Sequence, residues 1–156
     1  MILSFPITAA VLGMLLAQFV KIPIHLIMTG EVNWKLMLSS GGMPSSHTST
    51  IIALTTAIGL TSGPYSNDFA ICVIVSAIVI YDAIGVRRQA GFHAEVLNKL
   101  MIDFNHLIEA LKDPNLKGIE SRKKLKELLG HKPVEVFFGI ITGIIVGFLA
   151  FYIYPF

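Results

Sequence analysis

Two histidine-containing segments carry the residue types that could do phosphate chemistry. They are Pro44-Ser45-Ser46-His47 and His131-Lys132-Pro133-Val134-Glu135, and each lies where a polar stretch gives way to a long apolar run. A histidine can attack phosphorus or transfer protons near neutral pH, and the start of a helix offers free backbone N–H groups to an anion. Two such segments in one chain favour phosphate chemistry at a membrane surface.

Long apolar blocks surround these segments and decide the fold class. The sequence is 54% hydrophobic and 14% charged, and charge is almost absent from four blocks. A bilayer core of roughly 30 Å needs about 20 helical residues. We therefore predict an all-α polytopic membrane bundle, one domain over residues 1–156, with about four transmembrane helices near 2–22, 46–62, 68–86 and 134–154. The second block is expected to be short or tilted.

The positions of the basic residues predict how these helices are oriented. All twelve lysines and arginines fall in two segments, Lys21 to Lys35 and Arg87 to Lys132. Cytoplasmic loops of membrane proteins carry an excess of Lys and Arg. Residues 21–46 and 87–133 are therefore expected on the cytoplasmic side of the cell membrane, with both termini on the other side.

The second basic segment is long enough for a cytoplasmic helical insertion, about 89–130. Apolar residues recur at three- and four-residue spacing over 94–111, which is typical of an amphipathic helix. A second helix is expected near 120–129, and its basic run 122–126 fits either contact with anionic headgroups or a solvated face. Because four helices make a thin bundle, we also consider a homodimer, with 94–111 as a candidate contact.

The predicted orientation brings the chemistry-bearing residues to one membrane face. They lie at four helix ends: Lys21; Ser45, Ser46 and His47; Asp82, Arg87 and Arg88; and His131 and Glu135. Ionisable groups at a membrane border are costly to hold there and usually serve a function. The sequence therefore predicts a single pocket at the inner leaflet. His25 and His106 are expected to be surface or interface residues.

The two motifs resemble those of a known superfamily. Pro44-Ser45-Ser46-His47 is similar to the Pro-Ser-Gly-His signature of the type-2 phosphatidic acid phosphatases, whose superfamily includes the vanadium-dependent haloperoxidases. The segment from His131 to Val136, with Gly139 beyond it, resembles the final motif, His-x-Pro-x-Asp-Val-x-x-Gly. Lys21 matches the lysine of the first motif, and Arg87 or Arg88 the conserved arginine. The chain looks like the divergent, compact bacterial branch.

The chain departs from the superfamily pattern in several places. About forty residues separate Arg87 from His131, where the family has six, and the arginine-proline pair of the first motif is missing. Glutamate at 135 replaces aspartate, and four helices replace six. His93 follows Arg87 at the family offset and is a rival to His131 as the nucleophile. His131 is favoured because proline, acid, valine and glycine follow it at the family spacing.

These residue types imply a metal-independent lipid-phosphate phosphatase. His131 would attack phosphorus to give a phosphohistidine, Glu135 would fix its tautomer, and His47 would protonate the leaving oxygen. The phosphate-binding groups would be Lys21, Arg87, Arg88 and the backbone of Ser45 and Ser46; Asp82 would either orient the arginines or form a structural ion pair.

No cofactor, metal or nucleic-acid partner is expected beside the lipid phosphate substrate. The alternatives are a non-catalytic lipid-phosphate or anion binder related to transport, and a structural membrane protein. The substrate would be a phosphomonoester or a diphosphate of a lipid, and the sequence alone leaves its headgroup and chain open.

Overall fold

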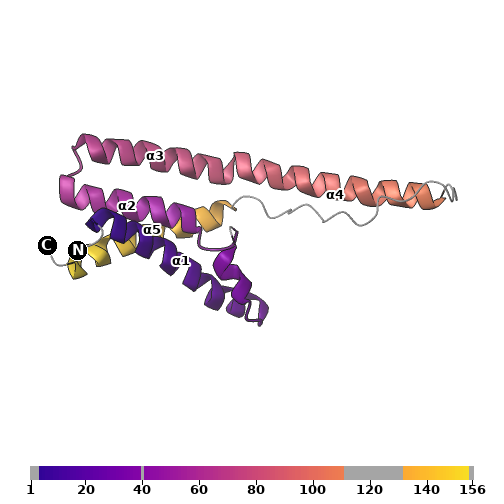
Figure 1. The fold of residues 1–156 in the computed structure, drawn as a ribbon, viewed down its shortest axis with the longest axis horizontal. Coiled ribbons are helices and arrows are strands. Elements are labelled where there is room, and N and C mark those ends of the chain that lie inside the picture. The colour runs from indigo at the N-terminus through magenta and orange to yellow at the C-terminus, as the bar shows by residue number, and fades with distance from the viewer. Residues whose placement is uncertain (1–3, 40, 111–131, 155–156) are drawn as a thin grey trace.

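The protein is built from helices, as the sequence predicts. The computed structural model describes residues 4–39, 41–110 and 132–154. In chain order these residues form α1 (Phe5–Thr29), a 3-10 helix η1 (Trp34–Leu38), α2 (Ser46–Ser62), α3 (Asn67–Ile84), α4 (Val86–Ala110) and α5 (Pro133–Ile153) (Figure 1). No strand occurs in these described ranges, and the all-α fold class is confirmed.

Within the described residues, three helical segments are long and apolar enough to cross a bilayer: α1, α3 continued by α4, and α5. The helix predicted near 46–62 forms as α2, but its 17 residues extend only about 25 Å at 1.5 Å per residue. That length is below the roughly 30 Å of a bilayer core, as expected for the shortest block. Helix α1 runs to Thr29, beyond the predicted end at 22, and stops where Gly30 takes φ 76°.

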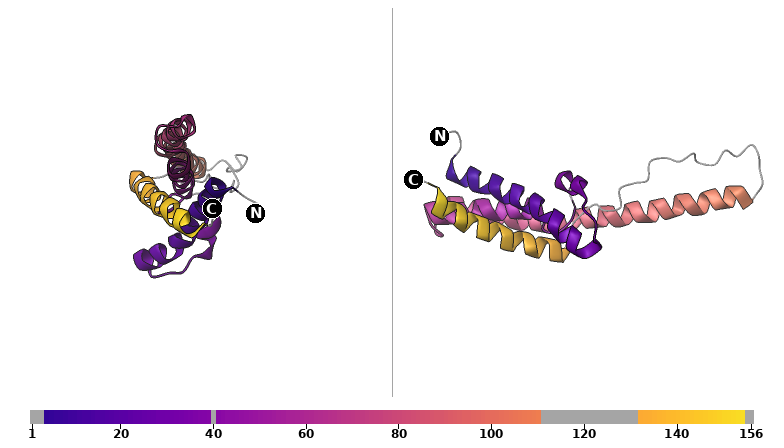
Figure 2. Two further views of the ribbon diagram at one scale, coloured as in Figure 1. Left: turned by 90° about the vertical axis from the view of Figure 1, so that its left-hand side faces the viewer. Right: turned by 90° about the horizontal axis from the view of Figure 1, so that it is seen from below.

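Helix α2 lies at the centre of the bundle and contacts α1, α3 and α5. The view along the bundle from the end that holds both termini shows the helices gathered around it (Figure 2). At this end lie the start of α1, the 63–66 connection and the end of α5. The end of α1, the start of α2, the α3–α4 junction and the start of α5 lie at the other end (Figure 1).

Small residues let α2 approach its neighbours closely. A Cβ added to Gly139, Gly143 or Gly147 of α5 would lie within 3.0 Å of atoms of α2, and one added to Gly13 of α1 would lie 2.9 Å from Ala53 Cβ. Such stripes of small residues are typical of helices that associate in membranes, where packing replaces the hydrophobic effect as the attraction. The stripe therefore fixes α5 directly against α2.

Hydroxyl groups link the same helices. Ser49 Oγ donates to the carbonyl oxygen of Gly13 at 2.9 Å, joining α2 to α1. Thr55 Oγ1 and Ser76 Oγ lie 2.8 Å apart, joining α2 to α3. These bonds satisfy polar groups that would be costly in an apolar bundle.

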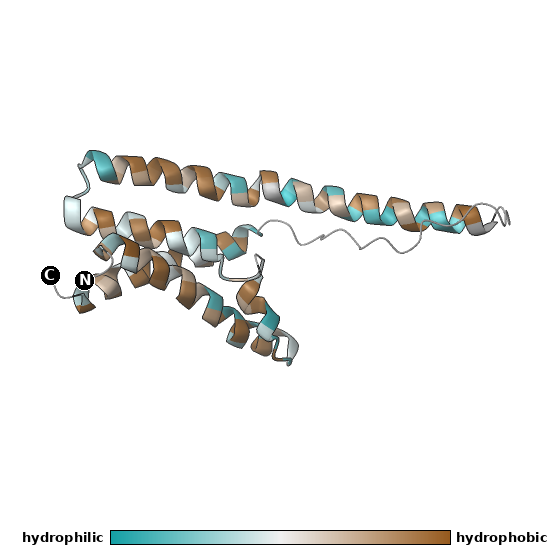
Figure 3. Ribbon diagram, in the orientation of Figure 1, coloured by the Kyte–Doolittle hydropathy of each residue, from teal (hydrophilic) through white to brown (hydrophobic). Residues whose placement is uncertain are grey.

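Helix α4 continues the direction of α3 (Figure 1). The hydrogen-bond pattern runs through the junction, because Gly85 N donates to Tyr81 O at 2.8 Å and Gln89 N to Gly85 O at 3.0 Å. The predicted amphipathic helix 94–111 is thus the continuation of the third span and has no separate start. Its mixed hydropathy contrasts with apolar α3 (Figure 3).

Apolar side chains of α4 are exposed, among them Val96, Leu100 and Leu107. The homodimer contact expected on this helix stays a prediction. The second helix expected near 120–129 and its basic run lie outside the described residues.

Candidate active site

The candidate site contains a buried lysine, which lies at the end of the α1 face that packs on α2. On α1, Ala9, Gly13, Ala17 and Lys21 recur every fourth residue and are all buried. Lys21 is only 2% exposed, and its Nζ donates to the carbonyl oxygen of Ser39 at 3.1 Å. The face that packs α1 on α2 therefore ends in a positive charge held away from water.

The segment before α2 covers this lysine. Gly42 adopts φ 93°, a left-handed conformation that glycine takes without a steric penalty. A Cβ added there would lie 3.7 Å from Cδ of Lys21, so a side chain at this position would touch the lysine stem. The turn at Gly42 thus forms one wall of the lysine's surroundings.

The start of α2 is capped by Ser45. Its hydroxyl oxygen accepts hydrogen bonds from Thr48 N at 3.4 Å and from Thr48 Oγ1 at 3.0 Å. Serine is among the preferred N-cap residues because its oxygen satisfies a free amide of the first turn. Ser45, Ser46 and Thr48 are buried, and His47 is exposed.

The starts of α2 and α5 are joined directly. Ser45 N donates to the carbonyl oxygen of Glu135 at 2.9 Å, so the Ser45 amide, expected at a phosphate, here holds the two helix starts together. Gly139 permits the contact, since a Cβ there would lie 2.8 Å from Ser45 O. The first and last motifs thereby meet in space.

Lys132 and Pro133 begin α5 in the manner expected of an N-terminus. The Glu135 carboxylate accepts a hydrogen bond from Lys132 N at 3.3 Å, which satisfies an amide that the helix leaves without an intrahelical partner. Glu135 also attracts the buried ammonium of Lys21 electrostatically. The same carboxylate therefore accepts a hydrogen bond at the start of α5 and attracts the ammonium group of Lys21.

A cavity of about 400 Å³ lies between these elements. Its charged and polar lining side chains are Lys21, His25, Lys132 and Glu135, and its remaining lining residues are Ile24, Met28, Leu36, Gly42, Met43 and Val134. Two lysines, a histidine and one glutamate thus line the cavity, a composition suited to an anion. Among the described residues, no three His, Cys, Asp or Glu side chains gather closely enough to hold a metal ion.

A model of the Divergent PAP2 family matches residues 3–146. The chain belongs to the Divergent PAP2 family. It is also similar to the "Uncharacterized membrane protein YuiD" of Bacillus subtilis (strain 168), with 45% identity over 152 residues, which cover 97% of this chain and 96% of the relative. No solved structure matches. The predicted resemblance is confirmed, and the chain is a membrane protein of the PAP2 type.

Among the described residues of this PAP2-type protein, the predicted Arg88, His93 and Asp82 are not part of the cavity lining. Arg88 is exposed, with its guanidinium carbon 5.5 Å from the ring centroid of Phe92. His93 is exposed on α4, and Asp82 is half-buried in the last turn of α3. His131 and the side chain of Arg87 lie outside the described parts of the chain. Of the predicted residues, the cavity brings Lys21 and Glu135 together.

Two cavity residues were missed by the sequence reasoning. His25 was expected to be a surface or interface residue, and it lines the cavity one turn after Lys21. Its spacing of four residues from Lys21 on a helix was the available signal, because such residues share a face. Lys132 lies inside the final motif, where the family pattern assigns it no role.

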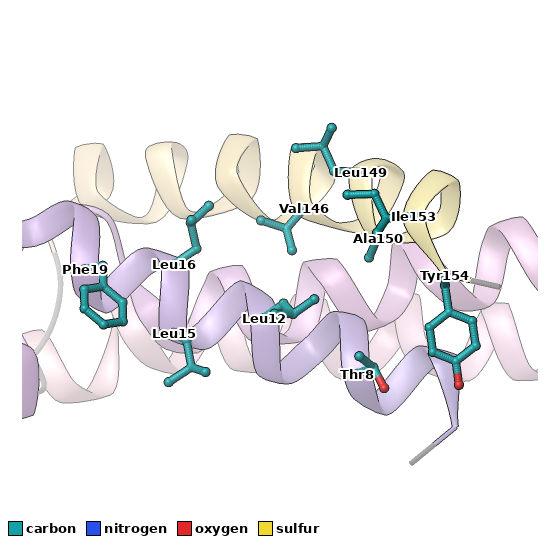
Figure 4. A pocket seen from close by; sticks show the side chains of 10 residues that line it. All are labelled: Thr8, Leu12, Leu15, Leu16, Phe19, Val146, Leu149, Ala150, Ile153 and Tyr154. Carbon is teal, nitrogen blue, oxygen red and sulfur yellow. The ribbon is translucent and has the colours of Figure 1, made fainter. Parts of the chain in front are cut away.

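A second cavity, of about 580 Å³, lies between α1 and α5 (Figure 4). Its lining is apolar apart from Thr8 and Tyr154, and Thr8 Oγ1 donates to Ser4 O at 3.2 Å. It offers no charged group for a phosphate. Of these two cavities, only the one at Lys21 offers charged side chains to an anion.

Proposed function

We propose that this Divergent PAP2 family protein hydrolyses a phosphomonoester or diphosphate of a membrane lipid through a phosphohistidine. The observation that carries the proposal is the buried Lys21 at the wall of a cavity, in a chain that belongs to the Divergent PAP2 family.

Burial of Lys21 makes an anionic ligand favourable. An ammonium group carries three donors, and among the described residues Ser39 O is the acceptor that Nζ contacts. Taking a charge out of water costs several kcal/mol unless partners compensate. Glu135 supplies part of that compensation, and a phosphoryl oxygen in the cavity would supply more.

The reaction assigned to the cavity runs in two steps. An imidazole nitrogen of His131 forms a bond to phosphorus while the bond from phosphorus to the lipid oxygen breaks, and His47 protonates that oxygen. Water then attacks the phosphohistidine, His47 takes its proton, and phosphate leaves. The bond from Ser45 N to Glu135 O supports this pairing, because it joins the helix start that carries His47 to the one that follows His131.

Arg87 and Arg88 are proposed to neutralise the phosphoryl oxygens, since guanidinium groups bind them in a bidentate manner. Asp82 would orient these arginines. His93 remains the second choice for the nucleophile. For this role α4 must bring its first turns toward the cavity.

The second candidate function is a lipid-phosphate binder without turnover. It is favoured by the positions of Arg88 and His93, which do not line the cavity. Such a protein would bind phosphate at Lys21 but would lack the arginine charge that stabilises a transition state.

The proposed orientation places this site in the cytoplasm. The termini share one end of the bundle (Figure 1), and the end of α1 and the start of α4 lie toward the other. A C-terminal alkaline phosphatase fusion is expected to be active in cells, and a C-terminal green fluorescent protein fusion dark. The reverse pattern would contradict the orientation.

Phosphate release from purified protein tests the activity. The protein in detergent, with a chelator present, is given phosphatidate, phosphatidylglycerol phosphate or a prenyl diphosphate. We expect phosphate from at least one of these lipids, loss of release in His131→Ala, and at least a hundredfold decrease in Lys21→Met. Lys35→Met is the matched control, because Lys35 is exposed on η1. Binding without release from any lipid would support the binder instead.

A further inference from the structure

His25 and Lys132 line the same cavity as Lys21 but come from different elements. His25 lies on α1, and Lys132 is the N-cap of α5. The residues contributed by η1 and by the segment before α2 are Leu36, Gly42 and Met43, which are uncharged. Positive charge and N–H donors therefore reach the cavity from two sides of the fold.

The three nitrogen-bearing side chains differ in depth. Lys21 is buried at 2% exposure, His25 is half-buried, and Lys132 is exposed. The backbone of Lys132 is held by the Glu135 carboxylate, so its side chain starts from an anchored position at the cavity. An anion that enters the cavity would therefore contact the exposed Lys132 first and the buried Lys21 last.

We propose that His25 and Lys132 are phosphate-binding residues that complete the anion site around Lys21. The proposal rests on the proposed function for the nature of the ligand, a phosphoryl group. An imidazole N–H and an ammonium both donate to phosphoryl oxygens, and charge-assisted bonds of this kind are stronger than neutral ones. Lys21 alone would supply a single charged contact, already shared with Ser39.

Equilibrium binding tests the proposal without needing turnover. Inorganic phosphate is titrated into detergent-solubilised protein, and phosphatidate in nanodiscs is compared with phosphatidylcholine nanodiscs, which separates free phosphate from a lipid headgroup as the source. We expect His25→Gln and Lys132→Met each to raise the Kd about tenfold, equivalent to about 1.4 kcal/mol. Lys132→Arg keeps the charge and is expected to restore binding to within threefold.

Matched controls come from α4. His106→Gln and Lys99→Met make the same changes at exposed positions of α4 outside the cavity lining, and neither should alter the Kd. Circular dichroism confirms that each variant is folded. An unchanged Kd in both cavity variants, or an equal rise in the controls, would overturn the proposal.

The two proposals fail in different ways. If wild-type protein binds phosphate, the cavity variants weaken binding, and no lipid releases phosphate, the phosphatase proposal fails and the binding site stands. If lipid phosphate is hydrolysed and His25→Gln and Lys132→Met leave both KM and Kd unchanged, only the binding-site proposal fails. A wild-type protein that binds neither free phosphate nor phosphatidate contradicts the binding-site proposal, and if in addition none of the three lipids releases phosphate, the phosphatase proposal fails as well.

Discussion

Replacement of Gly143 by alanine tests the close approach of α5 to α2. A Cβ at this position would lie 2.7 Å from Ile52 Cβ and 2.7 Å from the carbonyl oxygen of Ser49. Carbon atoms settle at about 3.5–4.0 Å, so the helices would have to separate by several tenths of an ångström. The Ser49 oxygen is backbone and cannot rotate away. The variant is therefore expected to be less stable than wild type.

The expected change in the stability of Gly143→Ala is the sum of two opposing contributions. Overpacking typically costs about 1–3 kcal/mol, whereas alanine in a helix interior is favoured over glycine by about 1 kcal/mol. Gly59→Ala on α2 carries the same propensity gain, but its Cβ meets only ring atoms of Phe69, the nearest at 2.9 Å. A ring can shift where a backbone cannot. The difference between the two variants therefore isolates the packing cost.

Thermal unfolding in one detergent, followed by circular dichroism at 222 nm, provides the measurement. A difference of about 2 kcal/mol corresponds to about 4–8 °C in Tm for a chain of this length. Gly143→Ala is expected to melt below wild type and below Gly59→Ala. If Gly143→Ala melts at or above Gly59→Ala, the α2–α5 contact described above is wrong.

Three smaller changes test individual contacts by the same melting assay. Ser45→Ala removes the N-cap acceptor of α2 and should cost about 1 kcal/mol; Ser45→Asp, which can also cap, should recover most of it. Thr55→Val deletes the hydrogen bond to Ser76 and should cost about 0.6 kcal/mol, typical of such bonds between membrane helices; no change in Tm would remove this link between α2 and α3. Glu135→Gln keeps an acceptor for the start of α5 but removes the charge that attracts the buried lysine, and a loss of about 1–3 kcal/mol is expected. A Glu135→Gln variant as stable as wild type would show that the lysine is compensated elsewhere.

The sequence predicted the helices well because membrane helices can be recognised from amino-acid composition. Long apolar blocks with few charges admit little besides membrane helices, and the helix starts at Ser45 and Pro133 carry standard N-terminal residues. The predicted end of α1 comes too early in the chain, because a lysine after a long apolar run indicates the border of a span. The helix continues through Lys21 to Thr29.

The site was predicted in part. The motifs identified Lys21 and Glu135 because charge at a helix end in an apolar chain is unusual. They did not single out His25: its spacing of four residues places it on the same helix face as Lys21, but that spacing alone does not show that α5 and η1 enclose a cavity at this face. Nor could they show that the Ser45 amide donates to α5, a contact that depends on Gly139 bringing the two helix starts together.

The short length of α2 explains why a cavity exists where it does. Helix α1 has 25 residues, which extend about 37 Å at 1.5 Å per residue. It is therefore longer than α2, against which it packs. The α1 residues that line the cavity, from Lys21 to Met28, belong to its last turns, and the rest of the lining comes from η1, residues 42–43 and the start of α5. The cavity thus occupies the space beyond the first turn of α2. A short central helix between longer ones leaves room for the cavity beside the buried lysine, and the small-residue face that packs α1 on α2 fixes the position of that lysine.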